Sequence, residues 1–336
     1  MTHRITRAAA VVSLLGMALP GSAWAEDWKF AIEEIPGSIM DSYAQEFKSR
    51  IETATGGDVT VTIYPLGSLG TPSEVAEQTA DGVINFSNLS VGNLGTIVPE
   101  SQFLLAPYLL PDDAAKISEV LATSPTLYRD LGSDFAAKGL HLGALYSEGP
   151  MVWTTKTEVL SPESAANFKM RVMVSPLLVS AYEGLGFSPT PVPFGEVYGA
   201  LQLGQVDGQV NPVSTIEEMK FYEVTDYMIW AGEQELITAV MASDDWYQTQ
   251  PKERQALIDK TLADLNGFIT PVVAEFNGAR LEKIKLAKPG LKMVELTTEQ
   301  RAPFRARAEA TQAAIGDLAG PRAAELLQAL KTEIGQ

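Results

Sequence analysis

Alternation between apolar and polar positions predicts a β-α-β-α-β unit at the start of the chain. The expected elements are strands at 28–32, 58–65 and 83–90 and helices at 40–57 and 71–82. The second helix has clear start signals, because Thr71 suits the N-cap, Pro72 the first helical position and Glu74 the third. Strands that alternate with helices predict a parallel sheet covered by helices.

A second region repeats this alternation and ends in helices. The expected strands are 139–148, 151–156, 167–175, a strand beginning at 206–212, one within 236–248 that then turns, and 289–296. The expected helices are 176–186, 195–205, 252–286, 297–316 and 320–335. Ser175 and Pro176 suit the start of the first of these helices, 188–194 reads as a proline-stiffened extended link, and Pro271 is expected to break the long helix softly.

These elements predict an α/β fold of two interleaved domains. No Gly/Ser linker separates the halves, and the closing helices must pack on parts already formed. The expected division is 26–148 with 237–276 as domain I, and 149–236 with 277–330 as domain II. Several crossovers would then form a hinge, with a small-molecule cleft at the carboxyl ends of the strands.

The first 25 residues read as a secretory signal peptide. Arg4 and Arg7 precede a short apolar stretch, and "AWA" at 23–25 suits cleavage before Glu26. No cysteine lies at this boundary, and no later run is long and apolar enough to span a membrane. The chain is therefore expected to be exported to a bacterial periplasm without inserting into the membrane.

Composition narrows the possible chemistry. The net charge is −17, and loss of Arg4 and Arg7 with the signal peptide would leave −19, which argues against nucleic acid as a partner. Cysteine is absent and His141 is the one histidine outside the leader, which removes most metal sites and leaves no cofactor indicated. An exported enzyme using acidic pairs is the competing hypothesis, but no G-x-S-x-G motif supports it.

Arg171 is the strongest candidate for a binding residue. It lies in an otherwise apolar strand, on the same face as Met173 and Ser175. A buried guanidinium is costly unless it is paired, and its planar fork suits a carboxylate. The partner is either an internal carboxylate, which would make Arg171 structural, or an anionic ligand.

Other candidates follow from position along the strands. Glu34, in the pair Glu33-Glu34, ends the first strand and could accept from a hydroxyl or ammonium group, although a solvated surface is the alternative. Asn211 follows another strand and is either an amide contact or a turn residue. Phe194, Trp153 and Met151 either line an apolar cleft or pack in the core.

These segments resemble the DctP-type solute-binding proteins of TRAP transporters. The resemblance rests on 168–212, "FKMRVMVSPLLVSAYEGLGFSPTPVPFGEVYGALQLGQVDGQVNP", with "YPLGSLG" at 64–70 and "KFYEVTDY" at 220–227. It covers essentially the whole chain and implies a type II periplasmic-binding-protein fold that closes on its ligand. It also implies that Arg171 binds a ligand carboxylate and that Asn211 and Phe194 line the pocket.

The segments around Glu34, 146–156 and 183–199 are most similar to the ectoine-binding branch, where the matching carboxylate meets a cationic ring. Two features depart from the family pattern: Met151 stands where many members have a second arginine, and Asn93 and 233–238 lack the aromatic residues of ectoine binders. The site residues expected from all of this are Arg171, Asn211, Glu34, Phe194, Trp153, Met151, Met173, Asn88 and Glu235.

The expected function is capture of a small carboxylate, either an ectoine-like zwitterion or a monocarboxylate, for sodium-coupled uptake by TRAP permease subunits. A C4-dicarboxylate or aromatic acid is the alternative ligand within the family. A sensory module that presents its liganded form to a receptor would use the same closure, and the sequence does not separate it from transport.

Overall fold

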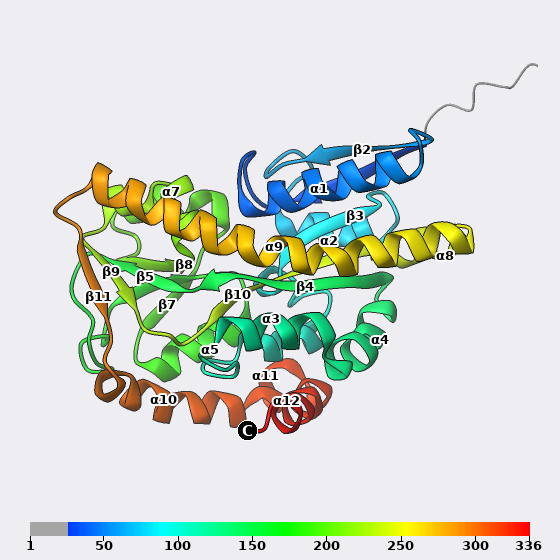
Figure 1. Ribbon diagram of the computed structural model, residues 1–336. Coiled ribbons are helices and arrows are strands. Elements are labelled where there is room, and N and C mark those ends of the chain that lie inside the picture. The colour runs from blue at the N-terminus through cyan, green and yellow to red at the C-terminus, as the bar shows by residue number, and fades with distance from the viewer. Residues whose placement is uncertain (1–25) are drawn as a thin grey trace, which may run out of the picture.

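The computed structural model describes residues 26–336, so the expected signal peptide lies outside the described residues. The chain forms two β-sheets flanked by helices, as the two halves of Figure 1 show. Both sheets are mixed, whereas the sequence pattern had predicted parallel pairing, and the α/β class is confirmed.

The first sheet has the strand order β2-β1-β3-β10-β4. Its strands are β1 (Glu26–Ile32), β2 (Val59–Tyr64), β3 (Phe86–Ser90), β4 (Leu140–Pro150) and β10 (Glu235–Ser243). The β1, β2 and β3 strands pair in parallel, as predicted, through the crossover helices α1 and α2. The β10 strand returns late in the sequence and pairs antiparallel with both β3 and β4.

The second sheet has the strand order β11-β9-β5-β8-β6-β7. Its strands are β5 (Val152–Thr155), β6 (Lys169–Val172), β7 (Ser188–Pro191), β8 (Gly208–Asn211), β9 (Tyr227–Trp230) and β11 (Lys292–Glu295). The proline-containing β7 lies at the edge, where a missing backbone N–H breaks no ladder. Parallel β6, β7 and β8 bring their carboxyl ends to one side of the sheet.

The helices fill the connections and both outer layers. The α-helices are α1 (Ile39–Ala54), α2 (Pro72–Ala80), α3 (Ala114–Thr123), α4 (Gly132–Ala136), α5 (Pro176–Leu185), α6 (Val197–Gln202), α7 (Val213–Glu218), α8 (Asp244–Thr249), α9 (Lys252–Ala287), α10 (Thr298–Ala313), α11 (Ile315–Ala319) and α12 (Pro321–Glu333). Short helical turns add η1 (Val91–Asn93), η2 (Pro99–Leu105), η3 (Thr126–Leu131), η4 (Phe194–Glu196) and η5 (Phe221–Val224).

The start signals read from the sequence are confirmed. The hydroxyl of Thr71 accepts from the backbone N–H of Glu74, and the carboxylate of Glu74 accepts from the backbone N–H of Thr71, which completes a capping box on α2. The hydroxyl of Ser175 accepts from the N–H of Leu178 at the start of α5. The strand predicted at 167–175 is too long, because β6 ends at Val172 and the chain must turn before this cap.

The long helix α9 runs without interruption for 36 residues, so the break expected at Pro271 is wrong. Pro271 is exposed, and the helix continues through it. In Figure 1 α9 spans the length of the molecule and lies against both halves. It contacts α1 and β4 on one side and α7 on the other.

The closing helices also join the two halves. The α10 helix packs on α5, beside the second sheet, while α12 packs on η2 and η3, beside the first. One apolar core accordingly contains residues from both halves, from Leu89 and Phe103 to Trp153 and Leu327. Domain boundaries within α9 and the closing helices stay a prediction.

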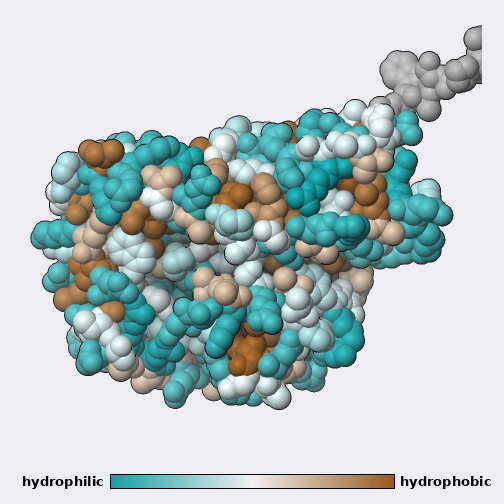
Figure 2. Space-filling view, viewed as in Figure 1, coloured by the Kyte–Doolittle hydropathy of each residue, from teal (hydrophilic) through white to brown (hydrophobic). Residues whose placement is uncertain are grey.

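The outer surface is mainly hydrophilic, with apolar side chains scattered over the face seen in Figure 2. Within residues 26–336, no helix has the length and apolar character that crossing a membrane requires.

Candidate functional site

A small cavity lies where the carboxyl ends of strands from both sheets meet. Its lining residues follow β1, β3, β6, β7 and β8 or end them, together with α7 and the start of β10: Glu33, Glu34, Ser90, Asn93, Arg171, Met173, Phe194, Asn211, Thr215 and Leu236. Ligands of open α/β folds bind at this edge of a sheet. The cavity measures about 20 Å³, which is room for a water molecule.

Arg171 is fully buried, with 1% of its surface exposed, and no carboxylate of the described chain forms an ion pair with it. Its Nε and Nη2 donate to the carbonyl oxygen of Val192, at 3.0 and 2.8 Å. Among residues 26–336, no group bonds its Nη1. Burial lowers the pKa of Arg171 to about 10, opposed by the charge of Glu33, so the guanidinium stays protonated at neutral pH.

Glu33 is held on the opposite side of the cavity. Its Oε1 accepts from the backbone N–H of Ser90 and its Oε2 from the Asn93 amide, both at 3.0 Å. Burial nonetheless raises the pKa of Glu33 to about 7. These two hydrogen bonds fix the carboxylate, while its charge lacks a directly bound cation.

Glu34 lies at the amino end of α1. Its Oε2 accepts from the N–H of Met40 at 3.2 Å, and its Oε1 accepts from the hydroxyl of Thr215 at 3.5 Å. Burial raises the pKa of Glu34. A helix amino terminus is a favourable place for a carboxylate, which offsets part of that burial cost.

Glu148, near the end of β4, is a carboxyl that the sequence did not single out. It is 0% exposed, its Oε1 accepts from Thr238 at 2.9 Å, and its Oε2 is unpartnered. Burial and the neighbouring charge of Glu34 raise the pKa of Glu148 well above its usual value. Burial and like-charge repulsion therefore favour the protonated form of Glu148.

Asn211 is the last residue of β8, and its side chain is buried beside Arg171 in the lining. Its Nδ2 donates to Gln209 Oε1 at 2.5 Å, and Gln209 in turn donates to Thr154 at 2.8 Å. This chain of side-chain bonds holds the Asn211 amide in one orientation. Phe194 supplies an apolar wall and leans edge-on against Phe221.

The remaining expected residues lie elsewhere. Trp153 is buried between Phe187 and Phe304, with its indole N–H donating to Glu233 at 2.6 Å. Asn88 donates to the hydroxyl of Tyr146 at 3.0 Å within the first sheet.

Two others also lie outside the cavity lining. Met151 is part of the apolar core, and Glu235 lines two separate cavities described below. Thus five of the expected residues come together around the cavity: Arg171, Asn211, Glu34, Phe194 and Met173.

Several lining residues were not expected. Ser90 and Thr215 also line the cavity, but serine and threonine are common in exposed turns, so no sequence pattern distinguishes these two residues. Asn93 and Leu236 stood in the regions that depart from the ectoine-binding pattern, and both prove to face the cavity. Glu33 lines the cavity together with Glu34, so both members of this acidic pair take part.

The two halves touch across the cavity. The hydroxyl of Thr215, in the second half, reaches Glu34 in the first, and the hydroxyl of Ser90 lies 3.4 Å from the sulfur of Met173. The hydroxyl of Ser175 also bonds Gln102 across the boundary. The small volume and these contacts describe a closed arrangement.

The residues that line the cavity include no histidine or cysteine. Within residues 26–336 no cluster of three or more His, Cys, Asp or Glu side chains could hold a metal ion. His141 stacks on Tyr247 and contacts Asp259 at 3.4 Å, remote from the residues that line the cavity. Charged and amide groups around a closed cavity suit reversible binding of a polar ligand.

Comparison with known proteins places this site in a family. The ectoine/5-hydroxyectoine-binding periplasmic protein UehA of Ruegeria pomeroyi is 36% identical over 99% of this chain and 98% of its own. The ectoine-binding protein TeaA of Halomonas elongata is 34% identical in a high-resolution structure that matches with a TM-score of 0.89, over 92% of this chain and 99% of that one. The apo-state structure of TeaA matches, over the same shares, with a TM-score of 0.82.

The sequence profile of the bacterial extracellular solute-binding proteins of family 7, or DctP family, matches residues 30–316. Over that length it includes every residue of the cavity lining. The chain therefore belongs to the DctP family of extracellular solute-binding proteins, as the resemblance predicted.

Proposed function

We propose that this protein is the periplasmic solute-binding subunit of a TRAP transporter and that it captures a small zwitterion of the ectoine type. The unpartnered Nη1 of Arg171 is the observation that carries this proposal. The Val192 carbonyl fixes the orientation of the guanidinium, and no carboxylate among residues 26–336 pairs with it. A buried cation in this state needs an anion from outside the chain. The names of UehA and TeaA support a ligand of this class.

The site has complementary charges for such a ligand. Arg171 Nη1 receives the carboxylate, and the Asn211 amide bonds its other oxygen. Glu33 and Glu34 lie around the same cavity and receive the cationic or N–H side. Phe194 and Leu236 pack on the apolar part, and exclusion of water strengthens each ion pair.

A single guanidinium disfavours a dicarboxylate. Arg171 is the one cation in the cavity lining, and a second carboxylate would meet Glu33 or Glu34. Like-charge contacts of this kind reduce binding free energy by on the order of several kcal/mol at protein interfaces. The same arrangement suits a monocarboxylate only if one of these glutamates is protonated.

Ligand entry requires the two halves to separate. A cavity of about 20 Å³ is much smaller than an ectoine molecule, and the contacts of Thr215 and Ser90 close it. The ligand would enter an open form and favour closure by contacting both halves. The permease would then recognise the closed form, in the periplasm that the names of the relatives indicate.

A thermal-shift panel tests the ligand class. Ectoine, 5-hydroxyectoine, amino acids, keto acids, aromatic acids and C4-dicarboxylates are each added to the purified protein. Ectoines are expected to raise the midpoint of unfolding by several degrees, because a ligand at about 1,000 times its Kd adds roughly 4 kcal/mol. A larger shift with a C4-dicarboxylate, or no shift with any carboxylate, would contradict the proposal.

A further inference from the structure

Two larger cavities lie beside the hinge and share no lining residue with the Arg171 cavity. They measure about 260 and 280 Å³. They share the residues Ala114, Ile117, Pro150 and Glu235, so they are adjoining chambers. Neither belongs to the site described above.

The wall between the chambers is part of the hinge. Pro150 is the last residue of β4 and pairs with Glu235, the first residue of β10, where the ladder shifts register. These strand ends connect the first sheet with the second. The first chamber is closed on one side by η2 and on the other by Trp230 and Arg301, so it contacts both halves.

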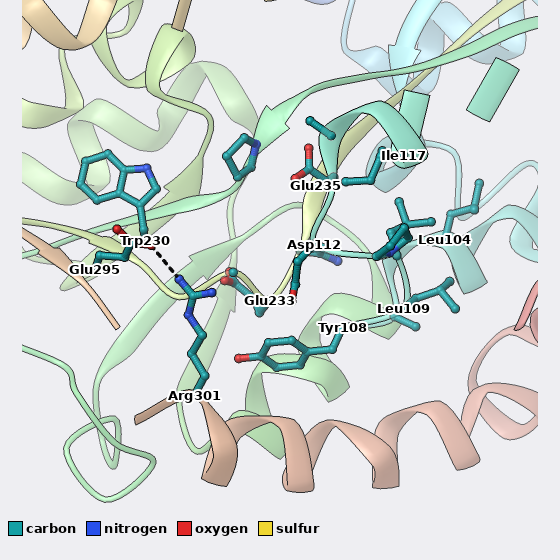
Figure 3. A pocket seen from close by; sticks show the side chains of 17 residues that line it. Leu104, Tyr108, Leu109, Asp112, Ile117, Trp230, Glu233, Glu235, Glu295 and Arg301 are labelled. Carbon is teal, nitrogen blue, oxygen red and sulfur yellow. Dashed lines mark hydrogen bonds and ion pairs between the residues drawn. The ribbon is translucent and has the colours of Figure 1, made fainter. Parts of the chain in front are cut away.

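Most charged groups of the chambers already have partners. Arg301 pairs with Glu295 at 3.4 Å, and Asp112 pairs with Arg305 at 3.1 Å. Glu235 has no ion pair among residues 26–336 and accepts only from the hydroxyl of Ser147. Its carboxyl lies between the two chambers and points away from Arg301 in Figure 3.

A second carboxylate, Glu233, also has an oxygen without a hydrogen-bond partner among residues 26–336. Glu233 is 1% exposed, and its Oε1 accepts from Trp153 and Tyr182. Its Oε2 has no partner, and Arg301 lies near it in Figure 3 without forming an ion pair. Burial raises the pKa of Glu233 and of Glu235 to about 7, as expected for carboxyls without a bound cation.

Apolar and aromatic side chains make up most of the remaining wall, beside polar groups such as Gln234, Asn266 and Thr270. Leu104, Leu109 and Trp230 face the first chamber, as Figure 3 shows, and Leu145 and Val273 face the second. Such walls suit an alkyl chain, and the face of an aromatic ring attracts a cation. A metal ion is disfavoured because the described chain offers no cluster of three metal-binding side chains.

We propose that these chambers form a second small-molecule site, for an organic ammonium ion. The ammonium group lies against Glu235, with Glu233 further into the first chamber. The alkyl chain lies along the apolar wall of the second chamber, between α3, β4 and α9. This assignment does not depend on the identity of the ligand bound at Arg171.

The test is calorimetric titration of the purified protein at pH 8 with n-butylammonium chloride, and with 1-butanol as a neutral probe of the same shape. Saturable binding with a Kd in the millimolar range or tighter is expected for the cation. 1-Butanol should bind at least about 10-fold more weakly, because it has no charge for Glu235 to pair with.

Three variants locate the site. Glu235→Gln should weaken butylammonium binding at least about 10-fold, and Ala114→Phe should abolish it by filling the boundary between the chambers. Glu119→Gln is the matched control, because it removes an exposed carboxylate of the same helix α3 outside the lining and should change nothing. Absence of saturable binding up to roughly 30 mM, equal affinity for 1-butanol, or wild-type affinity in both Glu235→Gln and Ala114→Phe would overturn the proposal.

Discussion

Arg171 is buried without a carboxylate partner among residues 26–336. Burial removes the hydration of the guanidinium and lowers its pKa to about 10, with the charge of Glu33 offsetting part of the shift. Among residues 26–336, the Val192 carbonyl is the one group that bonds it directly. A structural arginine of the same burial would have an internal carboxylate. The sequence posed these two alternatives, and the unpartnered Nη1 favours the ligand.

Glu33 predicts how ligand affinity depends on pH. A cationic group binds the ionised carboxylate, whereas burial raises the pKa of Glu33 to about 7. Lowering the pH from 8 to 5 should therefore weaken ectoine binding, by up to roughly 100-fold if only the ionised form binds. Calorimetric Kd values measured across this range check the expectation.

The control is Glu33→Gln, which should bind weakly at every pH. A flat wild-type affinity profile between pH 5 and 8 would contradict the role of Glu33.

The stability of the ligand-free protein should depend on pH in the opposite direction. A raised carboxyl pKa favours the folded state below pH 4.5, and this contribution is lost as the pH rises past 7.

At the scale of elements, the start of α5 links the cavity to a contact between the two halves. Its N-cap Ser175 follows β6 and Met173, and its hydroxyl both caps the helix and bonds Gln102 in the other half. Ser175→Ala should lower the free energy of unfolding by about 1–2 kcal/mol and also weaken ligand binding. Denaturant unfolding and calorimetry measure the two effects.

Thr297→Ala is the matched control, because Thr297 caps α10 in the same way without bonding the other half. It should lower stability by about 1 kcal/mol and leave ligand affinity unchanged. Equal effects of both variants on affinity would show that the Ser175 bond to Gln102 has no part in closure.

The elements that the sequence predicted well depend on local signals. Alternation located β1 to β3, and capping residues located the starts of α2 and α5. Whether Trp153 lines the cleft or packs in the core is decided by residues far away in the sequence. Alternation shows which side of a strand a side chain faces, but not what covers that side. Phe304 of α10 covers it, about 150 residues later in the sequence.

The sequence predicted a site residue where one charged side chain interrupted an otherwise apolar strand. Arg171 was such a residue, and Asn211 gained its weight from the family resemblance. Glu148 was not singled out because it lies in a Ser-Glu-Gly stretch of β4 that carries no motif, and its raised pKa depends on Glu34, which lies more than a hundred residues earlier. Buried pairs of this kind need the tertiary structure to be seen.

At the scale of the molecule, the long helix α9 contacts both halves. Arg280, near its end, donates to the Gly37 carbonyl before α1 and pairs with Glu217 and Glu218 of α7. Asn277, one turn earlier, bonds the Glu148 carbonyl and the N–H of Ser214. One helix thus bonds β4, the turn before α1 and α7, and so joins the two halves beside the cavity.

The proposed function places the ligand between Arg171 of one half and the carboxylates of Glu33 and Glu34 of the other. If Arg171 binds the ligand, replacing it should weaken binding without unfolding the protein. Arg171→Met keeps the apolar stem and removes the charge. Arg129→Met, which removes an arginine whose side chain is 75% exposed, is the control.

The most direct measurement is calorimetric titration of the two variants with the best ligand of the panel, beside their thermal unfolding without ligand. We predict that Arg171→Met weakens binding at least about 30-fold, while the free energy of unfolding of the ligand-free protein changes by less than about 2 kcal/mol. Arg129→Met should match the wild type in both. Near-normal affinity in Arg171→Met, with stability lowered by about 3–5 kcal/mol, would make Arg171 a structural residue and contradict the account.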